Sequence, residues 1–219
     1  MREIAGLVGV SRSSVSAWVR DIVLTPEQHE ALRQRNPAYN GQRLGQIARS
    51  RIAREQRLRW QEERRQQARL GNAVHAAGCM LFWAEGDKMR TAVRVSNSDP
   101  DLLRYFLDFL RRFYLESDAA VRIHCNLFAD HVERQHEIER FWLATLRLEP
   151  SALGKSIVNV YSKYSQKKRR NTLPYGTCKL VVHSTRVAQC LFGAIQEYGG
   201  FSNDWWVDCL PGVIGPSRR

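Results

Sequence analysis

A carboxylate at the end of an apolar stretch is the first feature of the sequence that could do chemistry. Residues 78–86 read GCMLFWAEG, so Glu85 closes an almost wholly apolar run that predicts a helix. A stripe on which a second helix could pack closely is formed by Ala73, Ala77, Met80 and Ala84. If the partner is the same helix of a second subunit, a two-fold axis brings the two Glu85 side chains together at helix ends that are already negative. That concentration of negative charge predicts a divalent cation, with Mg²⁺ as the expected ion.

The same residue types allow two other interpretations. The acid-glycine-acid sequence is an ordinary helix end if glycine is the C-cap and both acids lie in solvent. A zinc site or a His-dependent nuclease would use His131 and His136 with the neighbouring His124 and Cys125. A spacing of five residues places His131 and His136 on different faces of a helix, and the sequence offers no second ligand pair, so this interpretation is disfavoured. The sequence has no phosphate-binding glycine loop and no G-x-S-x-G, so no small-molecule substrate is expected.

The first 22 residues, MREIAGLVGVSRSSVSAWVRDI, have the spacing of two short helices joined by a tight turn. The apolar residues that would face each other are Ile4, Val8, Val10, Val15 and Trp18, with Ala5 small enough for a close crossing. Gly9 suits the left-handed turn and Ser11 the N-cap of the second helix. The pattern resembles a helix-turn-helix, whose second helix would present Arg12, Ser13, Ser14, Ser16 and Arg20 to a major groove. An ordinary helical hairpin is the alternative, and a complete domain of this kind has a further helix before the pair, from elsewhere or from upstream of Met1.

Positive charge favours an anionic polymer as the partner. The chain has 34 Lys and Arg against 22 Asp and Glu, a formal charge of +12. Residues 42–70 hold nine Arg and three Glu, and 9 − 3 = 6 is half of that charge. They predict one long helix that either tracks phosphates or is a solvated connector. Between two predicted strands, the segment SKYSQKKRRN is either a solvated loop or a phosphate clamp made of Lys163, Lys167, Lys168, Arg169 and Arg170.

Residues 71–201 have the pattern of an α+β core with a mostly antiparallel sheet. We expect helices ending at Glu85 and at about 100–114, 133–147 and 185–198, and strands at about 91–97, 120–128, 155–163 and 176–183. Alternation along the strands predicts one apolar face that packs on the helices and one polar face. The polar set is Arg94, Ser96, Arg122, His124, Asn126, Thr177, Lys179 and His183. In so basic a protein this face suits a groove of duplex DNA, and a merely solvated face is the alternative.

The opening stretch and the order of the elements together resemble the LAGLIDADG homing endonucleases over about residues 71–200. Residues 78–86 take the place of the nine motif letters, with Glu85 at the acid that binds metal and cleaves DNA. Met80 replaces the inner glycine of the motif and Trp83 its first acid. A second match at residues 191–199 has Tyr198 where the acid belongs, so one motif per chain and a homodimer are expected.

The resemblance also implies a fold and a reaction. The fold would have helices on one side of a DNA-facing sheet, and the reaction would be Mg²⁺-dependent cleavage of DNA. In the family a basic residue assists near the scissile phosphate, and Lys179 and Lys163 are the candidates here. Relatives in which such a core is joined to a helix-turn-helix and has lost cleavage act in transcription.

The sequence as a whole therefore predicts a sequence-specific protein that binds double-stranded DNA as a homodimer. Its expected parts are a helix-turn-helix at 1–25, a joint and long basic helix at 26–70, a core at 71–201 and a tail at 202–219. No apolar run approaches the ~20 residues of a membrane span, so a cytoplasmic protein associated with the nucleoid and without a membrane partner is expected. Five scattered cysteines predict reduced thiols. Two functions stay open: an endonuclease, which the retention of Glu85 favours, and a non-catalytic transcription regulator, which a second DNA-reading element favours.

Overall fold

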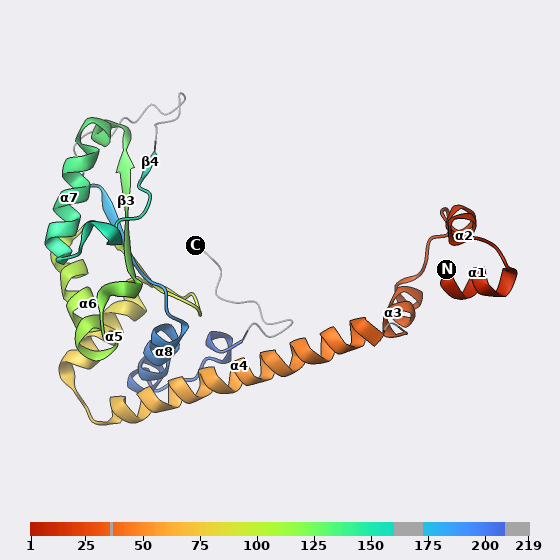
Figure 1. Ribbon diagram of the computed structural model, residues 1–219. Helices are drawn as coiled ribbons and strands as arrows, with labels where there is room; N and C mark the ends of the chain where they lie inside the picture. Colours follow the sequence, from red (N-terminus) through yellow and green to blue (C-terminus); the bar gives the residue numbers. More distant parts are fainter. Residues whose placement is uncertain (36, 160–172, 209–219) are drawn as a thin grey trace. The chain divides into compact units, whose positions relative to one another are not determined.

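The chain divides into two compact units, and the boundary between them lies within one long helix. The computed structural model describes residues 1–35, 37–159 and 173–208. Its compact units are Met1–Ile52 and Ala53–Arg219. Helix α4 (Pro37–Arg69) belongs to both of them (Figure 1). The core unit therefore begins at Ala53, well before residue 71, where the sequence pattern placed its start.

The N-terminal unit begins with two short helices joined by a tight turn. They are α1 (Arg2–Val8) and α2 (Arg12–Trp18), and α3 (Pro26–Gln34) follows. Gly9 has φ 69°, the left-handed conformation that the sequence predicted for the turn. Ser11 caps α2, and its hydroxyl accepts a hydrogen bond from the backbone N–H of Ser14 at 3.1 Å. The local signals for this helix pair are confirmed.

The predicted packing between these helices is only partly correct. Ala5 and Val15 are buried, as expected at a close crossing. Ile4, Val8 and Trp18, which were expected to face the other helix, are instead exposed, with Trp18 at 59%. Two helices of seven residues share little contact surface, so the small crossing covers only the side chains nearest to it.

The larger unit is an α+β fold. In chain order it contains α5 (Ala73–Glu85), β1 (Gly86–Asp87), β2 (Val93–Asn97), α6 (Pro100–Phe113), β3 (Val121–Phe128), α7 (Gln135–Leu146), β4 (Ile157–Asn159), β5 (Thr177–Val182) and α8 (Thr185–Gly199). Short 3₁₀ turns lie at Asp118–Ala120, Ala129–Arg134, Pro150–Ala152 and Asp204–Trp206. The predicted helices and strands are all present, and the last residues of the strand predicted at 155–163 lie outside the described residues.

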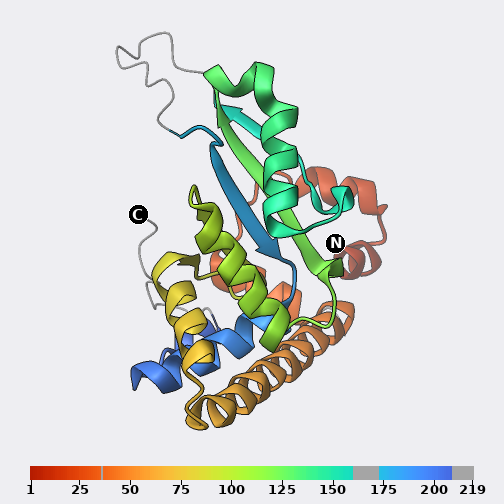
Figure 2. The same ribbon diagram turned by 90° about the vertical axis from the view of Figure 1, so that its left-hand side faces the viewer.

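The sheet is mixed, with strand order β1-β2-β5-β3-β4. Pairs β1–β2, β2–β5 and β3–β5 are antiparallel, whereas β3 and β4 are parallel. The expectation of a mostly antiparallel sheet is confirmed, and the one parallel pair lies at an edge. The cause is the helix α7 between β3 and β4, because a connection of that length can return the chain to run parallel. Figures 1 and 2 show α5, α6 and α7 along the same side of the sheet.

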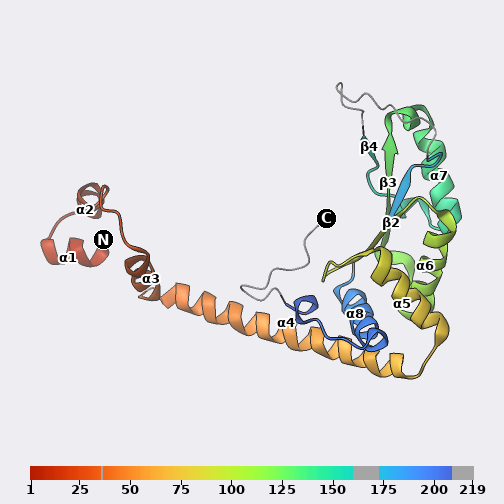
Figure 3. The same ribbon diagram turned by 180° about the vertical axis from the view of Figure 1, so that it is seen from behind.

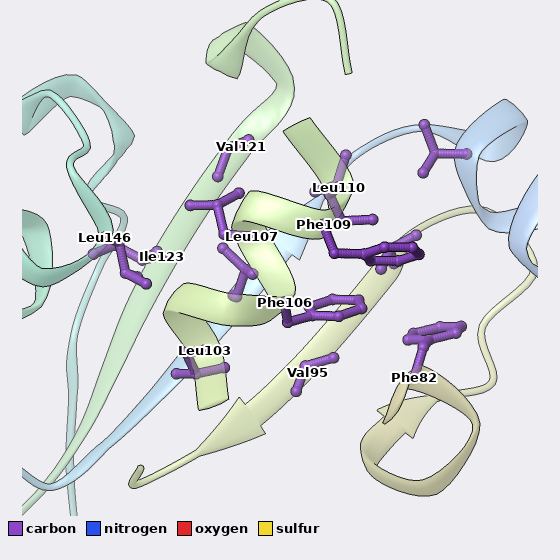
Figure 4. Packing of buried hydrophobic residues seen from close by; sticks show 14 of the residues in the cluster. Phe82, Val95, Leu103, Phe106, Leu107, Phe109, Leu110, Val121, Ile123 and Leu146 are labelled. Atoms are coloured by element: carbon purple, nitrogen blue, oxygen red, sulfur yellow. The ribbon is translucent and has the colours of Figure 1, made fainter. Parts of the chain in front are cut away.

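The core lies between this side of the sheet and its helices. Helix α6 is strongly amphipathic and begins with Asp99, whose side chain caps it, and Pro100. Figure 4 shows Phe106 of α6 beside Phe82 of α5, and their rings stack with centroids 5.9 Å apart. A Cβ at Gly78 would lie 2.3 Å from the ring of Phe109, so glycine allows α5 and α6 to pack closely. Fully buried side chains from the strands complete this core, among them Val121, Ile123, Cys125, Leu127 and Leu180.

The C-terminal half of α4 is part of this core and packs on α8 (Figure 3). The side chain of Gln61 is fully buried, donates to Gln189 at 2.8 Å and accepts from Gln196 at 3.1 Å. A Cβ at Gly193 would lie 2.2 Å from the backbone oxygen of Gln61. The interpretation of α4 as a solvated connector therefore does not hold beyond about residue 53.

Four cysteines are buried free thiols, as the sequence predicted, and Cys209 lies outside the described residues. Cys125 of β3 and Cys178 of β5 are direct partners across the strands. Burial raises the pKa of Cys79 to about 12 and that of Cys125 to about 11. In the part of the chain that the structure describes, no helix is long and apolar enough to cross a membrane.

Candidate nucleic-acid interface and acidic helix end

Helix α5 runs directly into the sheet at the acidic stretch. Gly86 ends the helix with φ −82° and ψ 149°, an extended conformation, and is paired with Val95 of β2. A Cβ at Gly86 would lie 2.2 Å from the ring of Phe82 and 2.6 Å from its carbonyl oxygen. Gly86 is the C-cap of α5 and both acids are exposed, as the alternative of an ordinary helix end expects, but the glycine is extended rather than left-handed and is required by close approach. The next residue, Asp87, is paired with Arg94 across β1 and β2.

Glu85 is exposed at this junction and has two polar neighbours that the sequence pattern did not single out. The side-chain amide of Asn97 donates to a Glu85 carboxylate oxygen at 3.4 Å. The ammonium group of Lys88 donates to the carbonyl oxygens of Phe82 at 3.2 Å and Gly86 at 2.6 Å, so it caps the end of α5. Burial lowers the pKa of Lys88, and the charges of Asp87 and Glu85 oppose that shift. The only sequence signal for Lys88 was a cation three residues after the acid.

One chain supplies few oxygen ligands at this place. The described residues contain no group of three or more His, Cys, Asp or Glu that could hold a metal ion. The second acid, Asp87, lies 3.9 Å from the guanidinium of Arg94. Mg²⁺ binds oxygen ligands and usually keeps several waters, so the exposed carboxylate of Glu85 is compatible with it but does not complete a site.

The histidines considered for a zinc site are separated. His131 is buried and accepts a hydrogen bond from the backbone N–H of Phe128 at 3.3 Å. His136 has a side chain that is 93% exposed and lies 3.2 Å from Glu139. His124 and Cys125 are adjacent on a strand, so their side chains are on opposite faces of the sheet. The structure does not bring these four residues together.

The polar face of the sheet is built from rows in register across three strands. We define the polar sheet face by Arg94, Ser96, Arg122, His124, Asn126, Thr177 and Lys179. The pairing places Lys179 of β5 directly between Ser96 of β2 and His124 of β3. The adjacent row contains Arg94, Val181 and Arg122, and a third row contains Thr177 and Asn126. The alternation that the sequence predicted is present in β2 and β3, whereas in β5 it breaks at Val181, which is buried, and His183 lies just beyond the end of that strand.

Interactions within the protein orient several of these side chains. The guanidinium of Arg122 donates to the carbonyl oxygens of Ala119 at 2.9 Å and Val121 at 2.6 Å. The Nδ1 atom of His124 lies 3.2 Å from the carbonyl oxygen of Lys155, and its ring occupies the space beside Gly154, where a Cβ would approach within 2.3 Å. Every member of the polar sheet face is partly or fully exposed, so all of them are available to a ligand.

Helix α2 presents only part of the set that was predicted for DNA. Arg12, Ser13 and Ser16 are exposed, and the Ser13 and Ser14 hydroxyls lie 2.7 Å and 2.9 Å from the Ser11 hydroxyl. Arg20 is exposed but lies beyond the helix, which ends at Trp18. The prediction that α2 itself presents Arg20 is wrong, because the helix is two residues too short.

The stripe expected to pack on a second subunit is mostly exposed, although Met80 also packs against the hydrophobic core. Ala73, Ala77 and Ala84 are exposed and Met80 is partly exposed. Trp83, which the sequence pattern did not include in the stripe, is 41% exposed. The opposite side of α5 is buried, and its residues are His75, Gly78, Cys79 and Phe82. A largely apolar helix with an exposed apolar side is unusual for a monomer, so this surface fits an interface.

The predicted phosphate clamp, with Lys163, Lys167, Lys168, Arg169 and Arg170, lies outside the described residues. Comparisons with known proteins give no match to a family model, to a curated protein or to a solved structure.

Proposed function

We propose that the chain binds specific sequences of double-stranded DNA through the polar sheet face and helix α2. The observation that carries this proposal is the register of the polar sheet face, in which Ser96, Lys179 and His124 form one row across three strands. A formal charge of +12 supports the same class of partner.

The dimensions of this face match duplex DNA. Neighbouring strands lie about 4.8 Å apart, so the two spacings from β2 to β3 cover about 10 Å. The major groove is about 12 Å wide and accepts β-structure. Successive rows are two residues apart along a strand, which is about 6.8 Å or two base-pair steps. Each row of side chains can then contact two successive base-pair steps. The serine, histidine and asparagine side chains would reach base edges, and the cations would reach phosphates.

A homodimer formed by α5 completes the proposal. The exposed apolar side of α5 supplies the contact, and a two-fold axis along it places the Glu85 carboxylates of both subunits near each other. Glu85 from each chain would hold Mg²⁺, which supplies an activated water and stabilises the leaving oxygen of a phosphodiester. The amide of Asn97 orients the Glu85 carboxylate, and Lys179 would contact the phosphate of the bound strand.

A second candidate is a regulator that binds DNA without cutting it. Two observations favour it. Both acids at the helix end are exposed, but Asp87 lies 3.9 Å from the guanidinium of Arg94, which leaves Glu85 as the acid without a cation beside it in the described interactions. Helix α2 also provides a DNA-reading element separate from the sheet, as a regulator would use. Binding is common to both candidates, and cleavage separates them.

The binding experiment measures affinity for the genomic region of the gene as a function of salt. Each phosphate contact contributes about 0.9 to the slope of log K against log salt. The triple variant Arg94→Gln, Arg122→Gln and Lys179→Gln should flatten the slope by up to about 2.7, because three contacts are lost. The matched control replaces three other arginines with glutamine: Arg104 of α6, Arg134 of the 3₁₀ turn before α7, and Arg140 of α7. If both triple variants change the slope equally, the polar sheet face is not the DNA surface.

The cleavage experiment compares Mg²⁺ with Ca²⁺ on the same DNA. Glu85→Gln keeps the shape and removes the charge, so binding should hold or strengthen while Mg²⁺-dependent nicking vanishes. Asp87→Asn is the control and should retain cleavage. If the parent protein binds a defined site but does not cut it in Mg²⁺ or Mn²⁺, the regulator is the correct function. If Glu85→Gln still cuts, Glu85 does not hold the metal.

A further inference from the structure

A cavity of about 440 Å³ lies at the end of the sheet where β3 begins and β5 ends. It is lined by residues from α4, from the end of α6 and its following loop, and from the start of α8. Its charged side chains are Arg64, Arg112, Arg186 and Glu116. Three cations and one acid give 3 − 1 = 2 positive charges around a space large enough for a small ligand.

The arginines are held in the cavity wall by contacts that leave donors free. The guanidinium of Arg64 lies 4.9 Å from the ring centre of Tyr114, and its Nε atom is buried without a hydrogen-bond partner among the described residues. Arg112 lies over the ring of Phe113 at 5.2 Å. The contact of Arg186 with an acid, Glu63, is long at 3.8 Å and exposed to solvent. The Nε atom of Arg64 has less than 1 Å² of accessible surface and so does not face the cavity, whose positive charge comes from the guanidinium groups of its three arginines.

The start of α8 adds a third feature that favours an anion. Ser184, at the N-cap, and Arg186 and Val187, in the first turn, all line the cavity. Backbone N–H groups of a first helical turn have no partner within the helix, and the helix dipole makes this end positive. The hydroxyl of Ser184 accepts from the N–H of Val187 at 3.3 Å, which leaves the other N–H groups of the turn available. Three cations and the start of a helix thus converge on one cavity.

We propose that this cavity binds a phosphoryl group, carried either by a free phosphorylated ligand or by the backbone of a nucleic acid. A phosphoryl dianion matches the net charge of +2 from the lining residues. Guanidinium groups bind phosphate through paired N–H donors, and the first turn of a helix binds it through backbone N–H groups. The cavity shares no lining residue with the acidic end of α5 or with the polar sheet face, although Ala119 in its wall accepts a hydrogen bond from Arg122 of that face.

The first arm of the test measures binding of inorganic pyrophosphate to the full-length protein by isothermal titration calorimetry at fixed low ionic strength. Arg112→Gln and Arg186→Gln are combined in one variant, since both side chains are exposed and their replacement leaves the core intact. The parent should bind at one site, and the variant should bind at least tenfold more weakly. The control combines Arg104→Gln with Arg140→Gln, two exposed arginines on α6 and α7, and should stay within twofold of the parent.

The second arm repeats the comparison with duplex DNA. Loss of pyrophosphate binding with unchanged DNA affinity assigns the cavity to a free phosphorylated ligand. Loss of both, with pyrophosphate competing against DNA, assigns it to backbone phosphate. Absence of saturable pyrophosphate binding, or binding that persists in the Arg112→Gln and Arg186→Gln variant, overturns the proposal. The pyrophosphate arm needs no DNA, so it stands or falls independently of the function proposed above.

Discussion

Replacing Gln61 with leucine tests whether the basic helix is part of the core fold. The Gln61 side chain is fully buried between α4 and α8, and its amide donates to Gln189 Oε1 at 2.8 Å and accepts from Gln196 Nε2 at 3.1 Å. Leucine has a similar size, so the change removes the hydrogen bonds and leaves the packing largely intact. The free energy of unfolding should fall for that reason alone.

The expected decrease in the free energy of unfolding follows from the hydrogen bonds that Gln189 and Gln196 each retain. Gln189 Oε1 loses the donor of its 2.8 Å hydrogen bond, and an unsatisfied buried acceptor costs about 1–3 kcal/mol. The amide of Gln196 keeps its bond to the carbonyl oxygen of Phe192 at 3.0 Å, so losing Gln61 there costs about 0.5–1.5 kcal/mol. Together these effects predict a decrease of about 2–4 kcal/mol.

Urea unfolding followed by tryptophan fluorescence measures this difference, with linear extrapolation to water. The matched control is Gln66→Leu, an exposed glutamine of the same helix whose amide contacts Glu62 at 3.4 Å. A surface change of this kind should stay within about 0.5 kcal/mol. If Gln61→Leu costs no more than the control, α4 does not pack on α8 as described.

Three further changes have defined outcomes. Burial lowers the pKa of His75 to about 4, so His75 gains a proton in the unfolded chain at a higher pH than in the folded chain. The free energy of unfolding should therefore fall by about 3 kcal/mol as the pH drops from about 6.5 to 4. Melting measured over this pH range should show a smaller fall for His75→Gln, whereas the exposed-residue control His136→Gln should behave as the parent does. Gly78→Ala should destabilise by about 1–3 kcal/mol in urea unfolding because its Cβ meets Phe109, whereas Gly45→Ala, with open space around it, should not. Ala77→Arg should reduce self-association in sedimentation and remove the concentration dependence of the melting temperature, because the folded chain is no longer stabilised by dimer formation; an unchanged dimer would place the interface elsewhere.

Much of the core could be predicted from the sequence because its signals are local. Alternation in residues 121–128 predicts which side chains of β3 are buried, and the helix expected at about 100–114 is α6, which begins at Pro100. Features that depend on contacts between residues far apart in the sequence could not be predicted in the same way. Burial of Gln61 has no signal in a stretch dominated by arginine and glutamine, because its partners lie on α8, more than 120 residues away.

At the acidic end of α5, too, local features could be predicted from the sequence and contacts between distant residues could not. The position of Glu85 at the end of α5 followed from the apolar run before it. The extended conformation of Gly86 did not, because the close approach of the Phe82 ring, rather than the glycine's own preference, decides it. The roles of Lys88 and Asn97 likewise depend on how the chain turns back from β1 to β2, which spacing alone does not specify.

The buried thiols have a consequence for labelling the protein. A thiolate is the form that reacts with maleimides and iodoacetamide, and the raised pKa values of Cys79 and Cys125 keep both residues protonated at neutral pH. Cys178 and Cys190 have raised pKa values for the same reason, their burial. Once Cys209 is replaced by serine, a single cysteine introduced at Ser96 would be the reactive thiol of the folded chain, so a crosslinker or fluorophore could be attached on the polar sheet face without altering the core.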